Sequence, residues 1–530
     1  MTLVEISGLT YSYPAAERAA LADLNLTIES GEFVVLAGLS GSGKSTLLRA
    51  ISGLVPHFHG GSIAGSVCVG GLDTRAHGPG ELAAVVGSLF QDPETQIVLG
   101  TPRSELGFGP ENRGWTDPVV ARAVEETALA LAIETLLDRP VGELSGGELQ
   151  RVALGATLSA RPAVVCLDEP TSQLDPVAGD ELIGLLRRLN EDSDMAVVLA
   201  EHRLERCLAA ADRVLALEDG RLAFDGAPER FLEWALEFQP ALVTPGARLL
   251  AGSGLPPVPG VKRARAALRS AGLNAGTAEQ DVARPSLSSR RSPPDETLRF
   301  NGVWHELRDG PAILRGVDLR IARGERVALM GRNGAGKSTL LRHAAGLMQP
   351  TRGKVSAAGR VALLLQSPRD YLVHDSVRGE ADAAALAAVG LGHLAERHPR
   401  DLSGGEQQRL ALAAVLGDPR RLAADTVLCL DEPTRGMDRA VKEELIRLLN
   451  GLQTAVVVAT HDPEFAASFA SRVVLLADGR VIADAAASEV LSGGTYFATE
   501  SARILDGAGG ALLPEQAVAL LRGNRVEAAV

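Results

Sequence analysis

The sequence has few cysteines, few aromatic residues and no long apolar run. Its four cysteines show neither the paired spacing of a metal site nor the dense pattern of a disulfide scaffold, which predicts reduced thiols in the cytosol. Two of them, Cys166 and Cys429, lie in apolar runs and are expected to be buried in strands. Runs such as FVVLAGL are far shorter than the roughly 20 residues of a membrane-spanning helix, and the N-terminal residues do not resemble a signal peptide. Any passage through a membrane would therefore be supplied by another chain.

Positive charge is also scarce. The chain has 53 Lys and Arg against 66 Asp and Glu, which gives a formal net charge of −13. An acidic balance disfavours general binding to nucleic-acid backbones or anionic lipid, so we expect no nucleic-acid partner. One basic stretch, KRARAALRS at 262–270, is predicted to be a short helix whose charges face solvent, with contact to anionic lipid or a partner as the alternative.

The same five motifs occur twice in the same order. The first copy comprises GLSGSGKS at 38–45, Gln91, LSGGELQR at 144–151, VVCLDEP at 164–170 and His202. The second comprises GRNGAGKS at 331–338, Gln366, LSGGEQQR at 402–409, VLCLDEP at 427–433 and His461. Such self-similarity predicts two domains of similar build. The interval between the glutamine and the LSGG motif is shorter in the second copy, so the two domains are expected to present different surfaces there.

Each copy alternates short apolar strands with helical patterns, which predicts an α/β fold with a mostly parallel sheet covered on both faces. We place the first domain at 1–240 and the second at 297–504. Residues 241–296 are rich in Pro, Ser, Gly and Arg, and this composition is typical of a flexible or extended linker. Residues 505–530 are expected to be a tail with one small amphipathic helix.

The two glycine-rich motifs each follow a strand and open a helix. Glycines at these positions let backbone N–H groups turn around phosphate oxygens, the lysine neutralises phosphate charge, and the serine hydroxyl can hold Mg²⁺. The motifs therefore predict two nucleotide sites. Their candidate residues are Gly38, Gly41, Gly43, Lys44, Ser45 and Thr46 in the first half, and Gly331, Gly334, Gly336, Lys337, Ser338 and Thr339 in the second.

Further polar residues follow the ends of strands. Asp168 and Asp431 are placed to reach Mg²⁺, together with Ser45 and Ser338. The next residues, Glu169 and Glu432, are candidates to orient or deprotonate the attacking water. The remaining candidates, which would reach the metal, the water or the γ-phosphate, are Gln91, Gln366, His202 and His461.

The LSGG motifs precede helices. Their serine hydroxyls, backbone N–H groups and helix dipoles can contact a γ-phosphate. The candidate residues are Ser145 and Gly147 in the first half and Ser403 and Gly405 in the second.

Together, these motifs in this order resemble the nucleotide-binding domains of ATP-binding-cassette (ABC) proteins. The resemblance covers both halves and implies two tandem P-loop NTPase domains of the ABC type. Each would have a mostly parallel core sheet, an antiparallel β subdomain and a helical subdomain, and would hydrolyse ATP with Mg²⁺ as cofactor. It also implies an internal heterodimer in which each ATP lies between the phosphate loop of one half and the LSGG motif of the other. One site would join Lys44, Ser45, Gln91, Asp168, Glu169 and His202 to Ser403 and Gly405; the other would join Lys337, Ser338, Gln366, Asp431, Glu432 and His461 to Ser145 and Gly147.

Within the same resemblance, Asp175 and Asp438 match a loop that crosses between the sites. Tyr13 matches the aromatic residue that stacks on adenine. The aligned position in the second half is Leu307, and Trp304 and His305 are the alternatives for contact with the base there.

A narrower resemblance lies in FQDPETQ at 90–96 and ELGFGPEN at 105–112, which are similar to the ATPase subunits of energy-coupling-factor importers. This implies uptake of a vitamin, a vitamin precursor or a transition-metal ion. The partners would be an integral membrane coupling protein and a substrate-binding membrane protein, with this chain on the cytoplasmic face of the cell membrane. The second half keeps only the glutamine, a proline and a glutamate of the pattern, in QSPRDYLVHDSVRGE at 366–380.

Two other classes stay open. A soluble, translation-associated ABC-F ATPase also has two cassettes, but it would carry a long charged helical linker in place of the Pro/Ser-rich segment. A duplicated sugar-importer ATPase often has a degraded second site, whereas this chain keeps Lys337, Glu432 and His461. A DNA-repair or chromosome-associated ATPase is disfavoured because the sequence shows no coiled-coil or zinc insertion.

Overall fold

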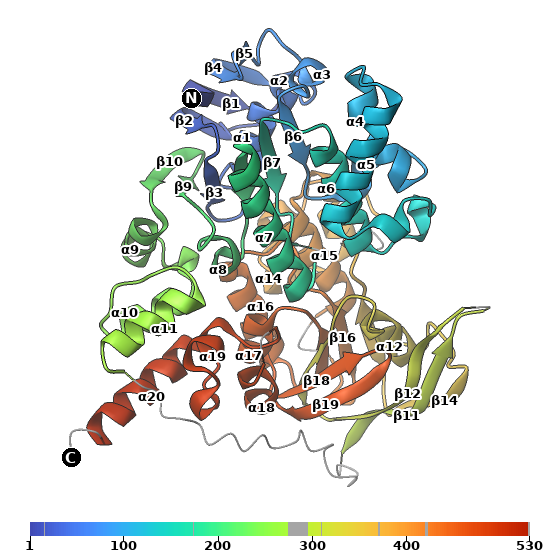
Figure 1. Cartoon of the computed structure of the whole chain (residues 1–530). Helices are drawn as coiled ribbons and strands as arrows, with labels where there is room; N and C mark the ends of the chain where they lie inside the picture. Colours follow the sequence, from blue (N-terminus) through green and yellow to red (C-terminus); the bar gives the residue numbers. More distant parts are fainter. Residues whose placement is uncertain are drawn as a thin grey trace. The chain divides into compact units, whose positions relative to one another are not determined.

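The computed structural model describes residues 1–527 except 15, 173, 274–294, 309, 369–370, 419–421 and 495. These residues form two compact units (Figure 1). The first contains residues 1–247 and 256–260, and the second contains residues 248–255 and those from 261 onward. Within the described ranges, no helix is long and apolar enough to cross a bilayer.

The first unit contains two sheets. The smaller is antiparallel, in the order β2-β1-β4-β5, and comprises β1 (Thr2–Ser12), β2 (Leu21–Glu29), β4 (Ser62–Val69) and β5 (Leu72–Asp73). The central sheet, in the order β10-β9-β3-β8-β7-β6, is parallel except for β10. It comprises β3 (Phe33–Ala37), β6 (Val86–Leu89), β7 (Val164–Asp168), β8 (Ala196–Ala200), β9 (Arg213–Glu218) and β10 (Arg221–Gly226). The expected mostly parallel sheet and antiparallel subdomain are both present.

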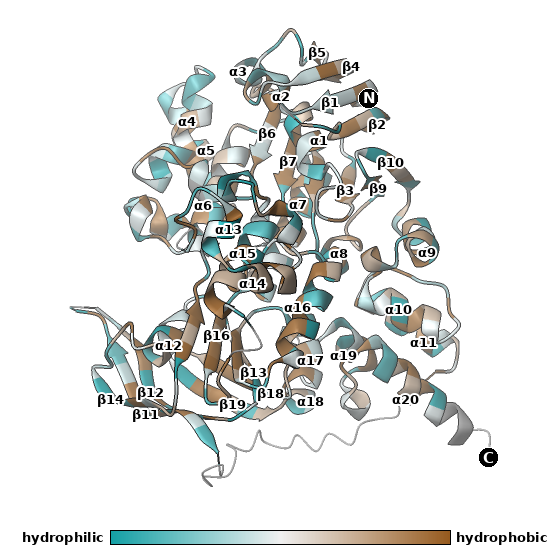
Figure 2. Ribbon diagram, turned by 180° about the vertical axis from the view of Figure 1, so that it is seen from behind, coloured by the Kyte–Doolittle hydropathy of each residue, from teal (hydrophilic) through white to brown (hydrophobic). Residues whose placement is uncertain are grey.

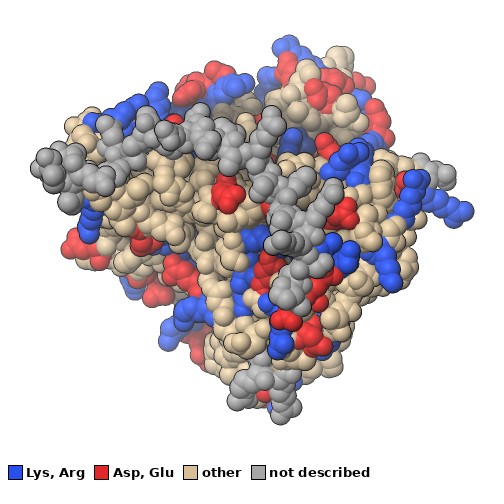
Figure 3. Space-filling view, turned by 90° about the horizontal axis from the view of Figure 1, so that it is seen from below, with Lys and Arg blue, Asp and Glu red and all other residues tan. Residues whose placement is uncertain are grey.

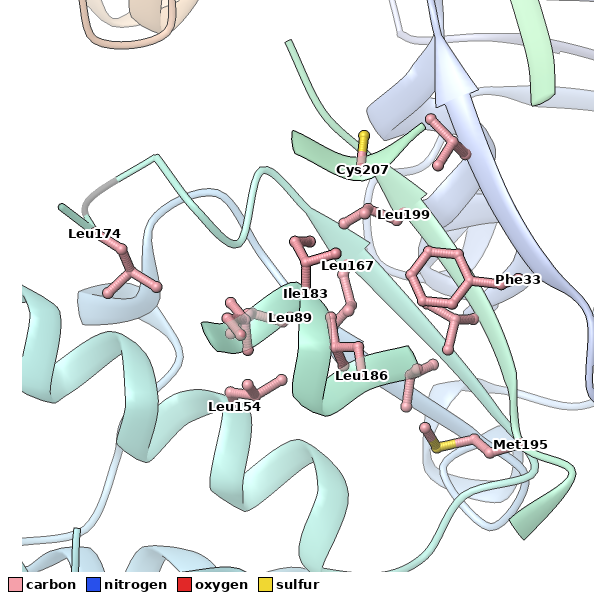
Figure 4. Close-up of a cluster of buried hydrophobic side chains, with 14 of the residues drawn as sticks. Phe33, Leu89, Leu154, Leu167, Leu174, Ile183, Leu186, Met195, Leu199 and Cys207 are labelled. Carbon is pink, nitrogen blue, oxygen red and sulfur yellow. The ribbon is translucent and has the colours of Figure 1, made fainter. Parts of the chain in front are cut away.

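Helices pack against this central sheet and form a subdomain of their own. They are α1 (Lys44–Ile51), α2 (Leu54–His57), α3 (Pro79–Leu82), α4 (Pro102–Asn112), α5 (Asp117–Leu131), α6 (Gly146–Ser159), α7 (Pro176–Ser193), α8 (Leu204–Cys207) and α9 (Pro228–Phe238). Figure 4 shows apolar side chains from the sheet, such as Phe33, Leu167 and Leu199, meeting Leu154 of α6 and Leu186 of α7. Because strands β3, β7 and β8 are buried along their whole length, their carboxyl ends are held rigidly side by side.

The second unit repeats this plan. Its antiparallel sheet, in the order β12-β11-β14, comprises β11 (Glu296–Glu306), β12 (Ala312–Ala322) and β14 (Arg352–Ala357). Its central sheet, in the order β15-β16-β17-β13-β18-β19, comprises β13 (Arg326–Met330), β15 (Val361–Leu364), β16 (Val427–Asp431), β17 (Ala455–Ala459), β18 (Arg472–Ala477) and β19 (Arg480–Ala486). Cys166 and Cys429 are buried in β7 and β16, as expected.

The helical segment before the LSGG motif differs between the units, in line with the shorter interval in the sequence. In the second unit α13 (Val377–Glu380) and α14 (Ala383–Ala388) stand where the first unit has the longer α4 and α5. The other helices of this plan are α12 (Lys337–Ala344), α15 (Gly404–Leu416), α16 (Arg439–Gly451), α17 (Pro463–Phe469) and α18 (Ala487–Ser492). Brown apolar and teal polar residues alternate around many of the helices in Figure 2, as expected for helices with one buried face.

The segment expected to be a linker is partly helical. It contains α10 (Pro245–Gly252) and α11 (Val261–Ser270), while residues 274–294 lie outside the described part of the chain. Helix α11 packs against α19 (Glu500–Leu505) with Ala264 and Leu268 buried. Arg522 of α20 (Pro514–Glu527) donates to the Gly252 carbonyl at 2.9 Å. Helix α11 matches the short helix predicted at 262–270, whereas composition predicted a flexible or partly extended chain over the residues that form α10.

Acidic and basic side chains are interspersed on the face shown in Figure 3. The predicted basic helix is α11, and its Arg265 is not wholly exposed to solvent, because its guanidinium donates to the Arg503 carbonyl. Part of its charge therefore stabilises the packing of α11 on α19.

Candidate functional site

The phosphate loop of the first unit requires glycine at specific positions. Gly38 has φ 148°, and a Cβ there would lie 2.4 Å from Ser42 Oγ. Gly43, which precedes α1, has φ 106°, and its Cβ would lie 2.8 Å from the Ala20 carbonyl. The loop curls around Lys44, whose Nζ donates to the Gly38 carbonyl at 2.8 Å. Gly41 has open space beside it, so one side of the loop can receive a ligand.

The second unit builds the same loop. Gly331 and Gly336 have φ 149° and 100°, and Lys337 Nζ donates to the Gly331 carbonyl at 2.7 Å. Gly334, like Gly41, has open space beside it. The following helix, α12, begins at Lys337, so its first N–H groups point toward the loop and favour an anion there. Both units therefore carry a backbone cradle for phosphate.

Five predicted residues come together at the carboxyl ends of the strands in the first unit. Asp168 ends β7 and forms a hydrogen bond with Ser45. Glu169 Oε1 accepts from Gln91 Nε2 at 3.1 Å and lies 3.0 Å from His202 Nε2. The candidate base therefore contacts both the glutamine and the histidine, although the three residues follow three different strands.

In the second unit the corresponding carboxylates have similar surroundings. Glu432 Oε1 lies 2.9 Å from His461 Nδ1, and Asp431 forms a hydrogen bond with Ser338. The side chain of Gln366 is exposed. In both units the histidine contacts the glutamate, and the aspartate contacts the serine. The hydrogen bond from the glutamine to the glutamate is seen in the first unit.

Both candidate bases have a strained backbone. Glu169 and Glu432 have φ 52° and 49°, a left-handed backbone conformation that residues other than glycine rarely adopt. Each is held there by its backbone N–H, which donates at 2.9 Å to a carbonyl of the neighbouring strand, Ala200 or Ala459. The same strain at the same place in both units indicates that the fold holds this carboxylate in one orientation.

The electrostatics keep the candidate base ionised. Burial pushes the pKa of Glu169 upward, but the charge and hydrogen bond of His202, with Lys44 and Gln91, outweigh it, so the net pKa lies below its ordinary value. The pKa of Glu432 is also lowered, with burial opposed mainly by His461. Burial raises the pKa of Asp431 to about 6. Glu169 and Glu432 are thus available as charged acceptors of a proton or a water hydrogen bond.

The residues present fit a magnesium ion brought in with a nucleotide. Asp431 Oδ1 is buried without a hydrogen-bond partner, and Ser338 stands beside the same carboxylate. Across the described residues, no cluster of three or more His, Cys, Asp or Glu could hold a metal by itself. A serine, a carboxylate and substrate phosphates are a normal ligand set for Mg²⁺, which keeps several waters.

The LSGG serines begin helices. Ser145 caps α6 and Ser403 caps α15, each in a capping box with the glutamate three residues later. Gly405 lies close to the backbone, since a Cβ there would be 3.0 Å from the Gly436 carbonyl. Gly147 lies in the first turn of α6. Each motif therefore presents a helix N-terminus, the feature expected of an anion contact.

The loop after each glutamine is held to its strand by a residue whose role the sequence did not predict. Gln96 donates to the Ser88 carbonyl at 2.6 Å and accepts from the Phe90 N–H at 3.2 Å. In the second unit the Tyr371 hydroxyl makes the equivalent bonds, to Leu363 at 2.8 Å and from Leu365 at 2.9 Å. Different side chains thus fix the same turn.

A glutamate further along holds the end of each loop. Glu105 accepts from the Val98 and Leu99 N–H groups at 3.2 and 2.7 Å, and Glu380 accepts from the His374 N–H at 2.7 Å. The loops present a valine at the same distance from their glutamines, and both are exposed: Val98 by 69% and Val373 by 77%. The repeated glutamate was visible in the sequence, but its role as an acceptor for loop N–H groups was not.

The surroundings of the predicted adenine contact differ between the units. The Tyr13 hydroxyl lies beside α1 and accepts from Arg49 Nη1 at 2.7 Å. In the second unit Leu307 is exposed, and Trp304 lies under the guanidinium of Arg352 on β14. His305 packs on His343 of α12, with ring centroids 4.9 Å apart.

Two phosphate loops, each beside a strained glutamate and a histidine at the ends of parallel strands, define the chain as a duplicated P-loop ATPase. The profile of the ABC transporter family matches residues 21–172 and 314–435. The chain belongs to the ABC transporter family.

The sequences of named relatives align with nearly the whole chain. A protein of Streptomyces coelicolor named "Putative ABC transporter ATP-binding protein" is 41% identical, with 95% of this chain and 97% of that protein covered. One of the same name from Methanosarcina acetivorans is 36% identical, with 92% and 86% covered.

Solved structures share the fold at lower identity. The RNase-L inhibitor structure has a TM-score of 0.59 and 22% identity, covering 91% of each chain. An archaeal ribosome recycling factor, aABCE1, solved with a ribosomal stalk protein, has a TM-score of 0.59 and 23% identity, covering 92% of this chain and 91% of that one. These matches show that both units have the ABC-type α/β fold.

Proposed function

We propose that this chain is the ATP-hydrolysing subunit of an importer, taking up a vitamin, a vitamin precursor or a transition-metal ion through separate membrane proteins. In this proposal the two halves form two composite ATP sites, with Ser403 and Gly405 facing Lys44, and Ser145 and Gly147 facing Lys337. The supporting observation is that both halves keep the candidate hydrolysis residues. In each half the loop after the glutamine also exposes an apolar residue, Val98 or Val373. The relatives are named as ABC transporter ATP-binding proteins, which supports a transporter and specifies neither the solute nor the direction of transport.

The loops after the glutamines are the proposed contacts with the membrane partner. Gln91 contacts the candidate base at one end of its loop, and Val98 is exposed at the other, between turns held by Gln96 and Glu105. A cavity of about 500 Å³ lies beside the same loop and is lined by Gln91, Asp92 and Phe58, whose side chain is 77% exposed. An exposed apolar group on a loop tied to the active site suits a partner that senses the state of the nucleotide.

The proposed chemistry follows from the arrangement of this chain's residues. The lysine and the loop N–H groups would bind the β- and γ-phosphates, and the glutamate would accept a hydrogen bond from the attacking water. The histidine would hold the glutamate and contact the γ-phosphate. Bound Mg²⁺ would neutralise phosphate charge beside Ser45 and Asp168.

A translation-related role is the second candidate, since one structure with this fold is named as a ribosome recycling factor. At 23% identity the likeness extends to the fold alone. The relatives at 36–41% identity are named as transporter proteins instead. A sugar-importer role also fits less well, because such duplicated ATPases often have a degraded second site.

Purification from native membranes distinguishes these functions. We expect the chain to be isolated with integral membrane proteins, in amounts that do not depend on ribosomes. Mass spectrometry of the purified complex identifies the partners, and uptake assays with the substrate-binding partner then identify the solute. Recovery with ribosomes and without integral membrane proteins would exclude the importer assignment.

A second experiment tests the loops. We expect Val98→Lys combined with Val373→Lys to reduce the recovered membrane partner at least about tenfold, because a charge replaces an exposed apolar contact. ATP turnover of the isolated chain should stay within about twofold of the unsubstituted protein, since neither valine contacts the candidate base.

Ile482→Lys is the matched control. Ile482 is also an exposed apolar residue, but it lies on β19, at the opposite edge of the central sheet from β15, the strand that leads to Gln366. Full recovery of the partner with the two valine substitutions would show that the contact lies elsewhere.

A further inference from the structure

The two ATP sites differ beside their histidines. In the first unit the residue before His202 is Glu201, which is 3% exposed, and its Oε1 accepts from the Thr171 N–H at 3.0 Å. In the second unit the residue before His461 is Thr460, which is fully buried, and its Oγ1 accepts from the Asp462 N–H at 3.1 Å. Only the first side chain reaches back to the segment that carries the candidate base.

The peptide bond that Glu201 contacts is also held from its other side. Its carbonyl, that of Pro170, accepts from Nε2 of Gln150, a buried residue on α6, the helix that follows the first LSGG motif. The peptide group between Pro170 and Thr171, one residue beyond Glu169, is thus joined to the LSGG helix through Gln150 and to the histidine loop through Glu201. The corresponding glutamine of the second unit, Gln408, is equally buried, but its Nε2 has no hydrogen-bond partner.

A change in charge placement accompanies this difference. In the first unit Arg206 of α8 lies against Gly179 of α7, where a Cβ would be 2.4 Å from the guanidinium. The charges of Arg206 and Glu201 favour each other. Absence of a side chain at position 179 therefore makes room for the arginine.

The second unit has the opposite arrangement. Lys442 replaces the glycine and forms an ion pair of 2.7 Å with Asp462, while buried Phe465 replaces the arginine. The positive charge here comes from α16 and not from the helix after the histidine. The two units therefore place charge differently around the histidine loop. In the first unit the carboxylate of Glu201 accepts from the Thr171 N–H, whereas in the second unit the residue at the position of Glu201 is Thr460.

We propose that Glu201 is a positioning residue of the first ATP site: by holding the Pro170–Thr171 peptide between the histidine loop and the LSGG helix, it sets the turnover of that site, and the second site works without such a clamp. The proposal rests on the assignment of Glu169 and His202 to hydrolysis. In this proposal Glu201 acts by holding the peptide and not by binding the nucleotide or the attacking water.

Burial of the Glu201 carboxyl costs folding stability when the group is ionised, as the direction of its pKa shift shows. Burial raises the pKa of Glu201, the Thr171 hydrogen bond opposes the rise, and the charge of Glu169 adds to it. A carboxyl in this place destabilises the fold when it ionises, since the folded state favours its protonated form. Its hydrogen bond and the nearby arginine offset part of that cost.

Two substitutions separate positioning from packing. We expect Glu201→Thr, which introduces the second unit's residue, to lower kcat to about half or less of the unsubstituted protein, because hydrolysis at the first site becomes slower. The KM for ATP should change less than about twofold. Glu201→Gln should keep kcat near that of the unsubstituted protein, because its side-chain carbonyl can still accept from the Thr171 N–H.

Hydrogen exchange measures the clamp without reference to turnover. We expect amide exchange in peptides covering residues 168–176 to become about tenfold faster in Glu201→Thr and to change little in Glu201→Gln. Thr460→Val is the matched control: it replaces a buried hydroxyl with a methyl group at the equivalent position of the second unit, and kcat should fall by less than about twofold. Melting temperatures of all variants establish that each is folded.

Unchanged exchange in Glu201→Thr would overturn the clamp. Faster exchange with unchanged kcat would overturn its role in turnover. Equal loss of kcat in Glu201→Gln and Glu201→Thr would also overturn the proposal, because the hydrogen-bond acceptor would then not matter. Absence of ATP turnover in the unsubstituted chain would contradict the proposed function instead, while exchange would still report on the clamp.

Discussion

Because the two proposed composite sites work together in one cycle, Glu169→Gln and Glu432→Gln will each lower the rate of ATP turnover at least about tenfold, and the double substitution will lower it about 10²- to 10⁴-fold. The amide keeps the shape of the side chain but cannot accept a proton, and it weakens the contact with His202 or His461, each within 3.0 Å of its carboxylate. ATP binding should be spared, because the phosphate loops remain intact. Phosphate release measures turnover, and equilibrium binding of labelled ATP measures affinity.

Glu191→Gln is a suitable control, since this exposed residue lies on α7 and forms an ion pair with Arg187 on the same helix. Its turnover should match that of the unsubstituted chain. Full turnover in both Glu169→Gln and Glu432→Gln would remove these residues from the chemistry. A loss confined to one of them would instead show that the two sites hydrolyse ATP at very different rates.

The second large effect tests the composite sites. In a Glu432→Gln background, remaining turnover comes from the site with Lys44 and Glu169. We expect Ser403→Arg to reduce this turnover at least about tenfold and Ser145→Arg to leave it within about threefold, because the proposed head-to-tail arrangement places Ser403 at that site. Phosphate release in the two double variants provides the comparison.

The two serine substitutions are matched controls for each other. Ser145 and Ser403 each cap a helix in the same capping box, so either change removes one cap of about 1 kcal/mol. A difference between them therefore reports on the nucleotide site and not on stability. The reverse result, with Ser145→Arg inactive and Ser403→Arg active, would mean that each half completes its own site.

Much of the site followed from the sequence because local backbone sterics specify it. Gly38 and Gly331 have nearly the same φ, 148° and 149°, since a side chain at either place would collide with the loop. The helix starts at Ser145 and Ser403 follow from serine and glutamate three residues apart. The family resemblance joined Asp168, Glu169 and His202 in one site, and in the structure they follow neighbouring parallel strands, β7 and β8, whose carboxyl ends are aligned.

Other features depend on residues far apart in the sequence. Gln96 and Tyr371 differ chemically, yet each fixes the same turn, which no motif would indicate. The sequence predicted a short helix at 262–270, but not that this helix, α11, packs on α19, more than two hundred residues later. A contact between elements so far apart in the chain cannot be inferred from local propensity.

The sequence by itself determined two nucleotide-binding α/β domains and the residues of their phosphate loops, because these depend on short motifs and on glycine geometry. Tertiary structure alone decided how the side chains and peptide groups of each site are held. The strained backbone of Glu169 and Glu432, the contact of Gln91 with Glu169, and the peptide held by Gln150 and Glu201 all require elements that meet only in the folded chain. A buried hydrogen-bond partner is specified by where two elements pack, and that information is spread over the whole fold.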